Sequence, residues 1–148
     1  MILLKHINVH KSRRKKMLMT EEELPKVAVA SMNDTHLEDL IIINQLAHLI
    51  VEGDVDAITE KLDAFIIHTI EHFSVEEKMM LEKEFQAYPM HKTEHDRALA
   101  ELKETVSNWK AHKDLKALRY YIVTVMPSWL VQHVSTMDTV TARFLISK

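Results

Sequence analysis

The sequence predicts an all-α protein, an up-down-up-down antiparallel four-helix bundle preceded by an extended N-terminal arm. Apolar residues recur at three- and four-residue spacing along four long segments, as in helices that bury one face. The 148 residues include only 1 Gly and 3 Pro, too few turn formers for an all-β fold. Hydrophobic residues make up 47% of the chain, enough for the core of one globular domain. Short connections between the segments make neighbouring helices antiparallel.

Residues 1–31 are predicted to form an N-terminal arm or tail, followed by the bundle over residues 32–148. A basic cluster at residues 11–16 precedes an acidic patch at residues 21–23. The basic cluster is interpreted as a solvated tail, and contact with anionic lipid or nucleic acid is the alternative. The segment 25–31, PKVAVAS, is rich in β-branched residues and is typical of an extended arm.

The first helix is expected to begin at Asn33 or Asp34, because both side chains are suited to the N-cap position. Gly53 is expected to end it, since glycine favours the left-handed conformation that closes helices. The second helix is predicted over about residues 56–85. It ends before Pro89, because the residue that precedes a proline avoids the helical region.

The last two helices are predicted over about residues 90–111 and 115–146. Pro127 lies inside the fourth helix and is expected to kink it or to divide it in two.

Composition excludes several classes of site. Cysteine is absent, which rules out disulfides, thiolate zinc sites and iron–sulfur clusters. The formal net charge of -3 gives no case for nucleic acid as a partner. No apolar run is long enough for a membrane span, and the N-terminal charge follows the apolar piece, the reverse of a secretory signal. The sequence therefore predicts a cytoplasmic protein, with no partner protein identified.

The 10 histidines are the unusual feature of the composition. On the helix faces that should be buried, seven residues of metal-ligand type occur: His36, His72, Glu76, His91, His95, His133 and Asp138. Pairs spaced i, i+4 lie about 5–6 Å apart on one helix face, close enough for one metal centre. His133 and Asp138 are five residues apart, so they are expected to diverge around the helix and to reach adjacent metals only if Asp138 bridges.

Burying seven such groups without partners would cost several kcal/mol each, by rough estimate, and metal binding converts that cost into folding energy. The alternative is that each group is satisfied separately by water, backbone or another side chain. Five imidazoles and two carboxylates suit iron, zinc or manganese, and their number suggests two bridged metals with one open position. No histidine follows a glutamate by three residues, which argues against a ferritin-like oxidase. The His-Glu-x-x-His motif of zinc proteases is also missing.

Four motifs resemble those of the hemerythrin family. The run His72-Phe73-Ser74-Val75-Glu76-Glu77, followed by Met80, is similar to the family's HF-x-x-EE-x-M signature. The family's His-x-x-x-His matches His91 and His95, and its WL-x-x-H-x-x-x-x-D matches the segment from Trp129 to Asp138. The segment 33–36 resembles its first-helix D-x-x-H, with Asn33 in place of the aspartate, and the resemblance covers about residues 27–144.

The resemblance implies a non-haem di-iron centre that binds dioxygen reversibly, in a carrier, store or sensor rather than an enzyme. Three histidines would hold one iron: His91, His95 and His133. Two would hold the other and leave it an open position: His36 and His72. Glu76, Asp138 and a solvent oxygen would bridge the two iron ions, and small anions such as azide would compete at the open position. The alternatives are a di-iron enzyme acting on peroxide or nitric oxide, and an oxygen-responsive interaction module.

A dry wall is expected around the bound gas, because water would promote loss of the oxygenated form. Its candidate residues are Phe73, Leu130, Val134, Ser135 and Met137. The hydroxyl of Ser135 is expected to admit water, so loss of the oxygenated form should be faster than in a Ser135→Leu variant. His68, one turn before His72, is interpreted as a core histidine bonded to backbone. The alternative is a hydrogen bond to a ligand residue or a role in proton relay.

Overall fold

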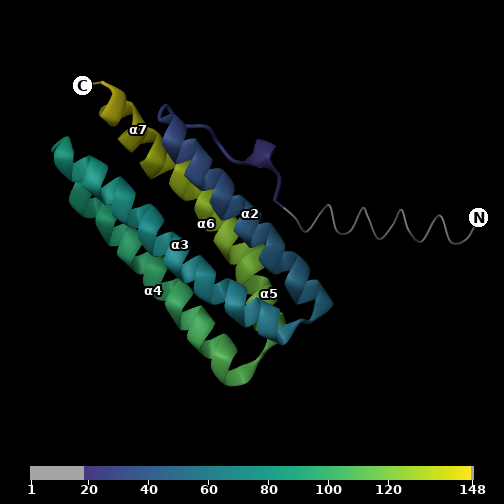
Figure 1. Ribbon diagram of the computed structural model, residues 1–148. Coiled ribbons are helices and arrows are strands. Elements are labelled where there is room, and N and C mark those ends of the chain that lie inside the picture. Colours follow the sequence, from purple (N-terminus) through teal and green to yellow (C-terminus); the bar gives the residue numbers. More distant parts are fainter. Residues whose placement is uncertain (1–18, 148) are drawn as a thin grey trace, which may run out of the picture.

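A computed structural model describes residues 19–147 and arranges them as four antiparallel helical stretches (Figure 1). The first three stretches are single helices: α2 (Ala30–Glu52), α3 (Val55–Glu82) and α4 (Tyr88–His112). The fourth consists of α5 (Leu115–Tyr120), η2 (Tyr121–Val125), α6 (Met126–His133), η3 (Val134–Asp138) and α7 (Thr139–Ile146). Over the described residues there is no strand, and the predicted up-down-up-down bundle is confirmed.

Two of the three connections between the helical stretches are tight turns of the same design. Gly53 ends α2 with a φ of 71°, and the Asp54 carboxylate then accepts a bond from the Ala57 amide at the start of α3. Lys113 ends α4 in the same left-handed region, and Asp114 caps α5 through the Ala117 amide. A left-handed residue followed by a capping carboxylate reverses the chain within two residues, which makes the joined helices antiparallel.

The predicted start of the first helix is wrong by three or four residues. The helix begins at Ala30 with Val29 at the N-cap position, so Asn33 already lies in the first turn. The Asn33 amide instead bonds the backbone of Val27 twice, accepting from its N–H at 2.8 Å and donating to its carbonyl at 2.9 Å. Asn33 therefore fastens the arm to the helix rather than capping it.

Pro89 was predicted to separate the second and third helices, but it is part of the third. It lies in the first turn of α4, where a missing N–H costs nothing because that group would have no helical partner.

The fourth stretch is not divided at Pro127. The backbone stays helical, but η2 is a π turn, with a wider hydrogen-bond ring than an α turn. This turn contains Val123, whose carbonyl would meet the proline ring in a regular α-helix. The π turn removes that conflict, so the stretch continues through Pro127 into α6.

The described part of the arm packs on the bundle, with one 3-10 turn, η1 (Glu21–Glu23), near its start (Figure 1). Met19, Leu24 and Val27 are buried, and the Asn44 side chain donates to the Met19 carbonyl at 2.9 Å. The basic cluster at residues 11–16 lies outside the described residues. The division into arm and bundle therefore stays a prediction.

The apolar core fills the half of the bundle next to the Gly53 and Lys113 turns. Its fully buried side chains include Leu46, Ile58, Leu62, Leu102 and Ile122. The other half is therefore left for the buried polar residues.

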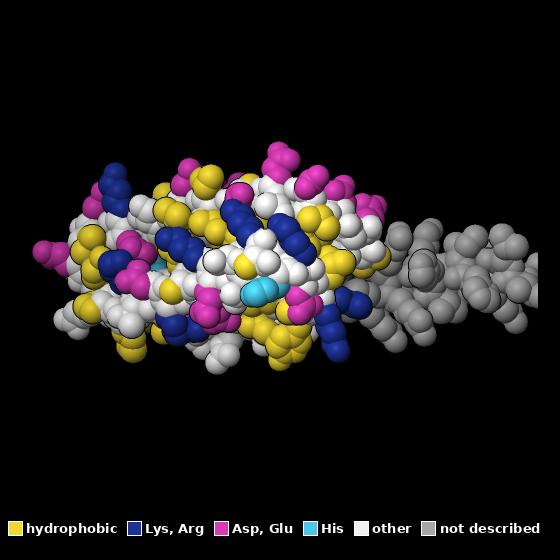
Figure 2. All heavy atoms as spheres, turned by 90° about the horizontal axis from the view of Figure 1, so that it is seen from below, with side chains coloured by type: hydrophobic (Ala, Val, Ile, Leu, Met, Phe, Trp, Pro, Cys, Tyr) yellow, Lys and Arg dark blue, Asp and Glu magenta, His cyan; other side chains and the backbone are white. Residues whose placement is uncertain are grey.

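The surface carries both signs of charge. On the face drawn in Figure 2, basic and acidic side chains are interspersed with small apolar patches. Among the described helices, none combines the length and the apolarity that crossing a membrane would require.

Candidate metal centre

All seven predicted ligand-type residues lie together inside the polar half of the bundle. Each is at most 8% exposed, and each of the four helical stretches contributes at least one. The set consists of His36, His72, Glu76, His91, His95, His133 and Asp138. Their predicted convergence is thus present in the structure.

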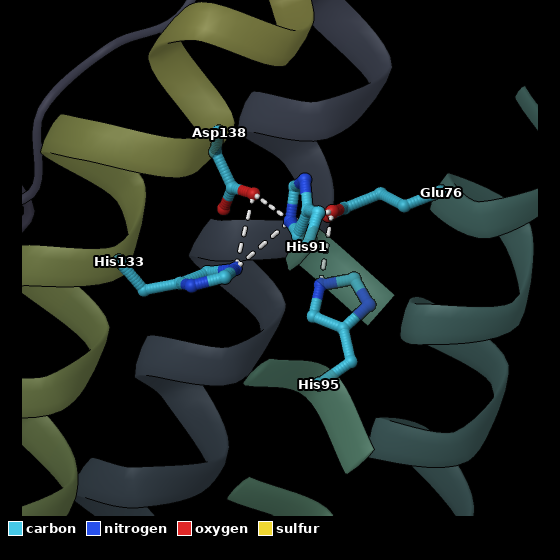
Figure 3. Close-up of side chains that lie close together, drawn as sticks. All are labelled: Glu76, His91, His95, His133 and Asp138. Atoms are coloured by element: carbon cyan, nitrogen blue, oxygen red, sulfur yellow. Dashed lines mark hydrogen bonds and ion pairs between the residues drawn. The ribbon is translucent and has the colours of Figure 1, made fainter. Parts of the chain in front are cut away.

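Five of these residues form one cluster, in which a ligand atom from each lies within 4.8 Å of every other (Figure 3). The members are Glu76, His91, His95, His133 and Asp138. The Nε2 atoms of His91 and His133 lie 3.2 Å apart. Two imidazole nitrogens that face each other at this distance share one proton or one cation, so the cluster is suited to a metal ion.

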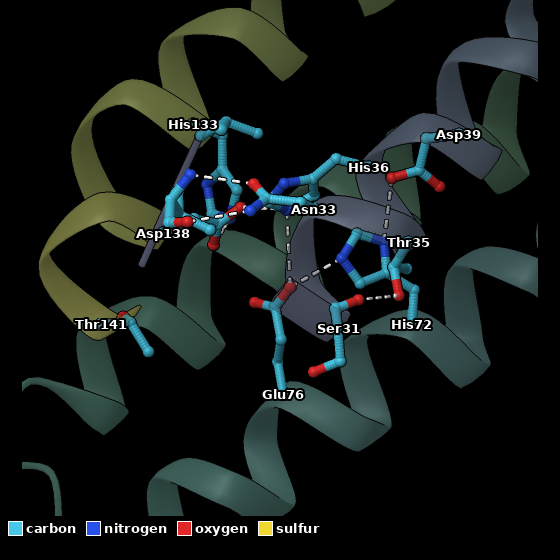
Figure 4. Close-up of polar contacts among 12 residues, drawn as sticks. Ser31, Asn33, Thr35, His36, Asp39, His72, Glu76, His133, Asp138 and Thr141 are labelled. Carbon is cyan, nitrogen blue, oxygen red and sulfur yellow. Dashed lines mark hydrogen bonds and ion pairs between the residues drawn. The ribbon is translucent and has the colours of Figure 1, made fainter. Parts of the chain in front are cut away.

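A second cluster shares Glu76 with the first and adds His36 and His72 (Figure 4). The Nε2 atom of His72 lies 2.6 Å from Glu76 Oε2. The Nε2 atom of His36 lies 4.0 Å from the same oxygen and 3.0 Å from Asp138 Oδ2. This side offers two imidazoles, against three in the first cluster.

Each carboxylate turns one oxygen toward each cluster. Glu76 Oε1 lies 3.5 Å from His91 Nε2 and 3.4 Å from His95 Nε2, while Oε2 faces His72. Asp138 Oδ1 lies 3.1 Å from His91 Nε2 and 3.2 Å from His133 Nε2, while Oδ2 faces His36. The two carboxylates therefore stand between the three-histidine side and the two-histidine side.

The expected divergence of His133 and Asp138 is wrong, and η3 explains why. This π turn spans Val134–Asp138, directly between the two side chains. A π turn closes a ring five residues long, so residues i and i+5 come onto one face. The five-residue spacing therefore brings the two side chains together.

Several atoms of the centre make no hydrogen bond of acceptable geometry among the described residues, although most of them lie 3.0–3.5 Å from another polar atom of the centre. They are both ring nitrogens of His36, Nε2 of His95, Oε1 of Glu76 and both oxygens of Asp138. Leaving buried polar atoms unpaired costs about 1–3 kcal/mol each. A cation among them removes that cost, and nitrogen and carboxylate donors fit a divalent transition metal.

The charges of the buried groups also favour a cation. Burial raises the pKa of the Asp138 carboxyl, but the nearby nitrogens of His133, His36 and His91 outweigh it and hold the pKa well below the usual value. Burial lowers the pKa of His72, but the carboxylates of Asp39 and Glu76 outweigh it and raise the pKa. Both shifts arise because carboxylates and imidazoles are packed together in a buried site, and the same carboxylates would attract a metal ion.

A second layer of hydrogen bonds orients three of the histidines. Nδ1 of His91 lies 2.8 Å from Thr141 Oγ1, within hydrogen-bond distance. Nδ1–H of His95 donates to Glu77 Oε2 at 2.9 Å, and Nδ1 of His72 lies 3.0 Å from Asp39 Oδ2. Such bonds fix the tautomer that leaves Nε2 free to bind a metal.

Sequence reasoning missed Asp39, Glu77 and Thr141 as partners of the ligand histidines. Asp39 carried a signal, since it lies three residues after His36 and so falls on nearly the same helix face.

His68 was predicted to bond to backbone, and this prediction is wrong. Its Nε2 lies 2.7 Å from Asp39 Oδ1, on the carboxylate whose other oxygen faces His72. The alternative of a hydrogen-bonded link to a ligand residue is the one that the structure contains, with Asp39 in between.

Aromatic rings cover the centre on one side. Phe73 stacks on His95, with centroids 3.9 Å apart and planes 2° from parallel. Trp129 stacks on His133 at 4.6 Å. A cavity of about 20 Å³ lies beside His72 and is lined by Phe73 and Leu130 among others.

The other expected wall residues differ in position. Val134 is fully buried, and Met137 is half-buried. Ser135 is exposed, with its hydroxyl bonded to the Gln132 carbonyl at 3.1 Å. Its place in the wall is therefore a wrong prediction, because two residues correspond to about 200° of helix rotation from His133. The expected effect of Ser135→Leu loses its basis.

Comparisons with known proteins agree with this geometry. The family profile described as Hemerythrin HHE cation binding domain matches residues 18–145. The chain is 33% identical over 129 residues to a bacteriohemerythrin of Aquifex aeolicus (strain VF5), covering 87% of this chain and 98% of the relative. It is 37% identical to a myohemerythrin of Sipunculus nudus over 78 residues, which cover 53% of this chain and 58% of the relative.

Solved structures extend the agreement to the fold. A crystal structure of wild-type hemerythrin superimposes with a TM-score of 0.74 at 25% identity, covering 87% of this chain and 97% of that one. The profile spans most of the chain, including all seven buried ligand-type residues. The chain belongs to the hemerythrin family.

Proposed function

We propose that this protein binds dioxygen reversibly at a non-haem di-iron centre, as an oxygen carrier, store or sensor. The observation that supports the proposal most strongly is the position of Glu76 and Asp138, each with one oxygen toward either histidine group. One carboxylate between two clusters would suit many metal sites, but two shared carboxylates suit a pair of ions.

The ligand assignment follows the two clusters. The three-histidine side would hold one iron through His91, His95 and His133. The two-histidine side would hold the other through His36 and His72, and so has fewer protein ligands. Two bridging carboxylates would offset half the charge of two ferrous ions. When bound, the iron pair supplies the electrons that reversible dioxygen binding requires.

The residues of this chain then have definable roles. Phe73, Trp129 and Leu130 exclude water from one side of the centre. Asp39, Glu77 and Thr141 hold the protons of three histidine Nδ1 atoms, so that each Nε2 stays unprotonated. Neutral imidazoles donate less negative charge to iron than carboxylates would. This disfavours the high-valent iron states that oxygenases use.

Absorption spectroscopy with an iron count tests the proposal. Reduced, iron-loaded protein should gain visible absorption on exposure to air and lose it again when the gas is removed. Azide should compete with the change, and elemental analysis should give two iron ions per chain. A single iron, or a spectrum that does not reverse, would contradict it.

The alternative of a peroxide- or nitric-oxide-reducing enzyme predicts a different outcome. Under that alternative, stopped-flow mixing with the substrate and an excess of reductant gives many turnovers per centre. Under the proposal, the same experiment gives binding without sustained consumption of the reductant.

A further inference from the structure

A cavity of about 170 Å³ opens to solvent between the first turns of α2 and the second half of α3. His72 and Glu76 form part of its lining, so two of the centre's buried residues face it. Figure 4 shows Ser31 and Thr35 of α2 beside these two residues. The cavity therefore leads from the surface to the two-histidine side of the centre.

The lining of this cavity is negatively charged. It includes the carboxylates of Glu38, Glu71 and Glu76 but no Lys or Arg from the described residues. Glu38 and Glu71 are exposed at the surface, whereas Glu76 is only 2% exposed, and its Oε2 atom faces His72, the other buried ligand-type residue of the lining. Carboxylates on the walls of a hollow raise the local concentration of cations and lower that of anions.

Metal-ligand groups also lie between the surface and the centre. His68 lines the cavity, and its side chain is 19% exposed. Together with Asp39 and His72 it forms a third group whose ligand atoms lie within 4.8 Å of one another. On the solvent side, Glu38 Oε2 lies 3.9 Å from His68 Nδ1. A cation that leaves the surface carboxylates would thus meet the imidazoles of His68 and His72 before it reaches Glu76.

This cavity is larger than the apolar cavity that is also lined by His72. Its 170 Å³ is several times the roughly 30 Å³ that one water takes up in the liquid, which is enough for a partly hydrated divalent ion. The apolar cavity of about 20 Å³ has no such room and is lined mainly by apolar side chains. A hydrated cation fits only the larger of these two cavities.

We propose that the cavity between α2 and α3 is the port through which divalent iron reaches the centre, with Glu38, Glu71 and His68 as contacts before His72 and Glu76. This inference rests on the proposed di-iron function. It assigns His68, which is linked to His72 through Asp39, to metal uptake in the protein without metal.

Uptake kinetics of metal-free, full-length protein test the port. Val75 lines the cavity and is 60% exposed, so a charge there sits at the mouth with little effect on folding. The variants are Val75→Glu, Val75→Gln and Val75→Lys, mixed with Co²⁺, whose visible absorption reports binding. Uptake should be fastest in Val75→Glu and slowest in Val75→Lys, by roughly tenfold at low ionic strength. The difference should nearly vanish near 1 M salt, where the Debye length is about 3 Å.

Val140 provides the matched control. It is 56% exposed on α7 and does not line the cavity. Val140→Glu and Val140→Lys should take up Co²⁺ at the rate of the unchanged protein. Equal rates in all Val75 variants, or the same spread at Val140, would overturn the port and indicate uptake by local opening of the helices.

The final occupancy separates the two proposals. Iron per chain after complete anaerobic loading should be two in every variant, because only the route is altered. A value of one would contradict the di-iron centre, while the order of the rates would still decide whether the cavity admits cations.

Discussion

The hydroxyl of Thr139 donates to the carbonyl of Val134 at 2.7 Å, across the π turn that carries Asp138. In a π turn the carbonyls are less regularly paired than in an α-helix, and a side-chain donor five residues on stabilises the wider ring. This bond therefore spans the turn that positions Asp138, one of the two carboxylates between the histidine groups.

Thr139→Val, which keeps the shape and removes the donor, should lower the free energy of unfolding by about 1 kcal/mol. It should also speed the loss of iron to a chelator, because Asp138 is held less firmly. Thr136→Val is the control, since that exposed hydroxyl bonds the Gln132 carbonyl at 2.7 Å and water can replace it. Urea denaturation and chelator kinetics measure both variants. Equal losses in the two would show that the π turn needs no such support.

The sequence was sufficient for the four helical stretches, though not for the start of the first helix, and for the burial of the seven ligand-type residues. Apolar spacing defined the four stretches, and inward histidines at i, i+4 are conspicuous because burying them is costly. The two π turns were not predictable, because the hydrogen-bond register within a helix is decided by packing against its neighbours. Without η3, the spacing of His133 and Asp138 was misread.

The partners of the histidines were the other missed feature. Glu77 and Thr141 reach His95 and His91 from other helices, at sequence separations of 18 and 50 residues. No local pattern relates such residues, so only the three-dimensional arrangement identifies them. Asn33 was misassigned for a similar reason, since its partner Val27 lies outside the helix.

The lowered pKa of Glu94 predicts that the free energy of unfolding of the metal-free protein depends on pH. Hydrogen bonds from Arg97 outweigh the effect of burial and, with the Trp129 indole N–H, lower the pKa of Glu94 from 4.5 to about 2. A lowered pKa gives stability that is present above pH ~4.5 and is lost as the pH falls toward 2. Glu94→Gln lacks this titration. The difference in unfolding free energy between the two proteins should be constant above pH ~5 and should shrink below it.

Urea denaturation at pH values between about 2.5 and 6 measures this difference. Arg97→Gln removes the main partner, so its own pH dependence should resemble that of Glu94→Gln. A difference that does not vary with pH would contradict the assignment of the lowered pKa to this contact.

Leu130→Ala tests whether the apolar wall of the centre slows decay of the oxygenated form beyond its contribution to the free energy of unfolding. Leu130 is 2% exposed and lines the small cavity beside His72, so its truncation should cost about 2–5 kcal/mol and admit water. The oxygenated form should then decay faster. Leu118→Ala is matched in burial, at 2% exposed, but does not line that cavity. It should lose similar stability with an unchanged decay rate, as measured by urea denaturation and by visible absorption over time. Faster decay in both would mean that stability, not the wall, protects the centre.

Asp39→Asn tests the hydrogen bonds behind His72. Asp39 is 5% exposed, and its two oxygens face Nδ1 of His72 and Nε2 of His68. An amide has one acceptor oxygen, so one of the two histidines would lose its acceptor. Changes of this kind behind a ligand histidine typically lower metal affinity by about 10–100-fold. Iron transfer to a competing chelator should therefore become easier by that factor.

Two further variants, His68→Leu and Asp63→Asn, serve as comparisons for Asp39→Asn. His68→Leu leaves Asp39 bonded to His72, so its effect on affinity should be smaller than that of Asp39→Asn, although iron uptake through the port should slow. Asp63→Asn removes an exposed ion pair with Lys110 on the opposite half of the bundle and should leave affinity unchanged. If Asp39→Asn and Asp63→Asn retained iron equally well, the orientation of His72 would depend on helix packing alone. If His68→Leu weakened affinity as much as Asp39→Asn, the three residues would act as one unit in holding iron.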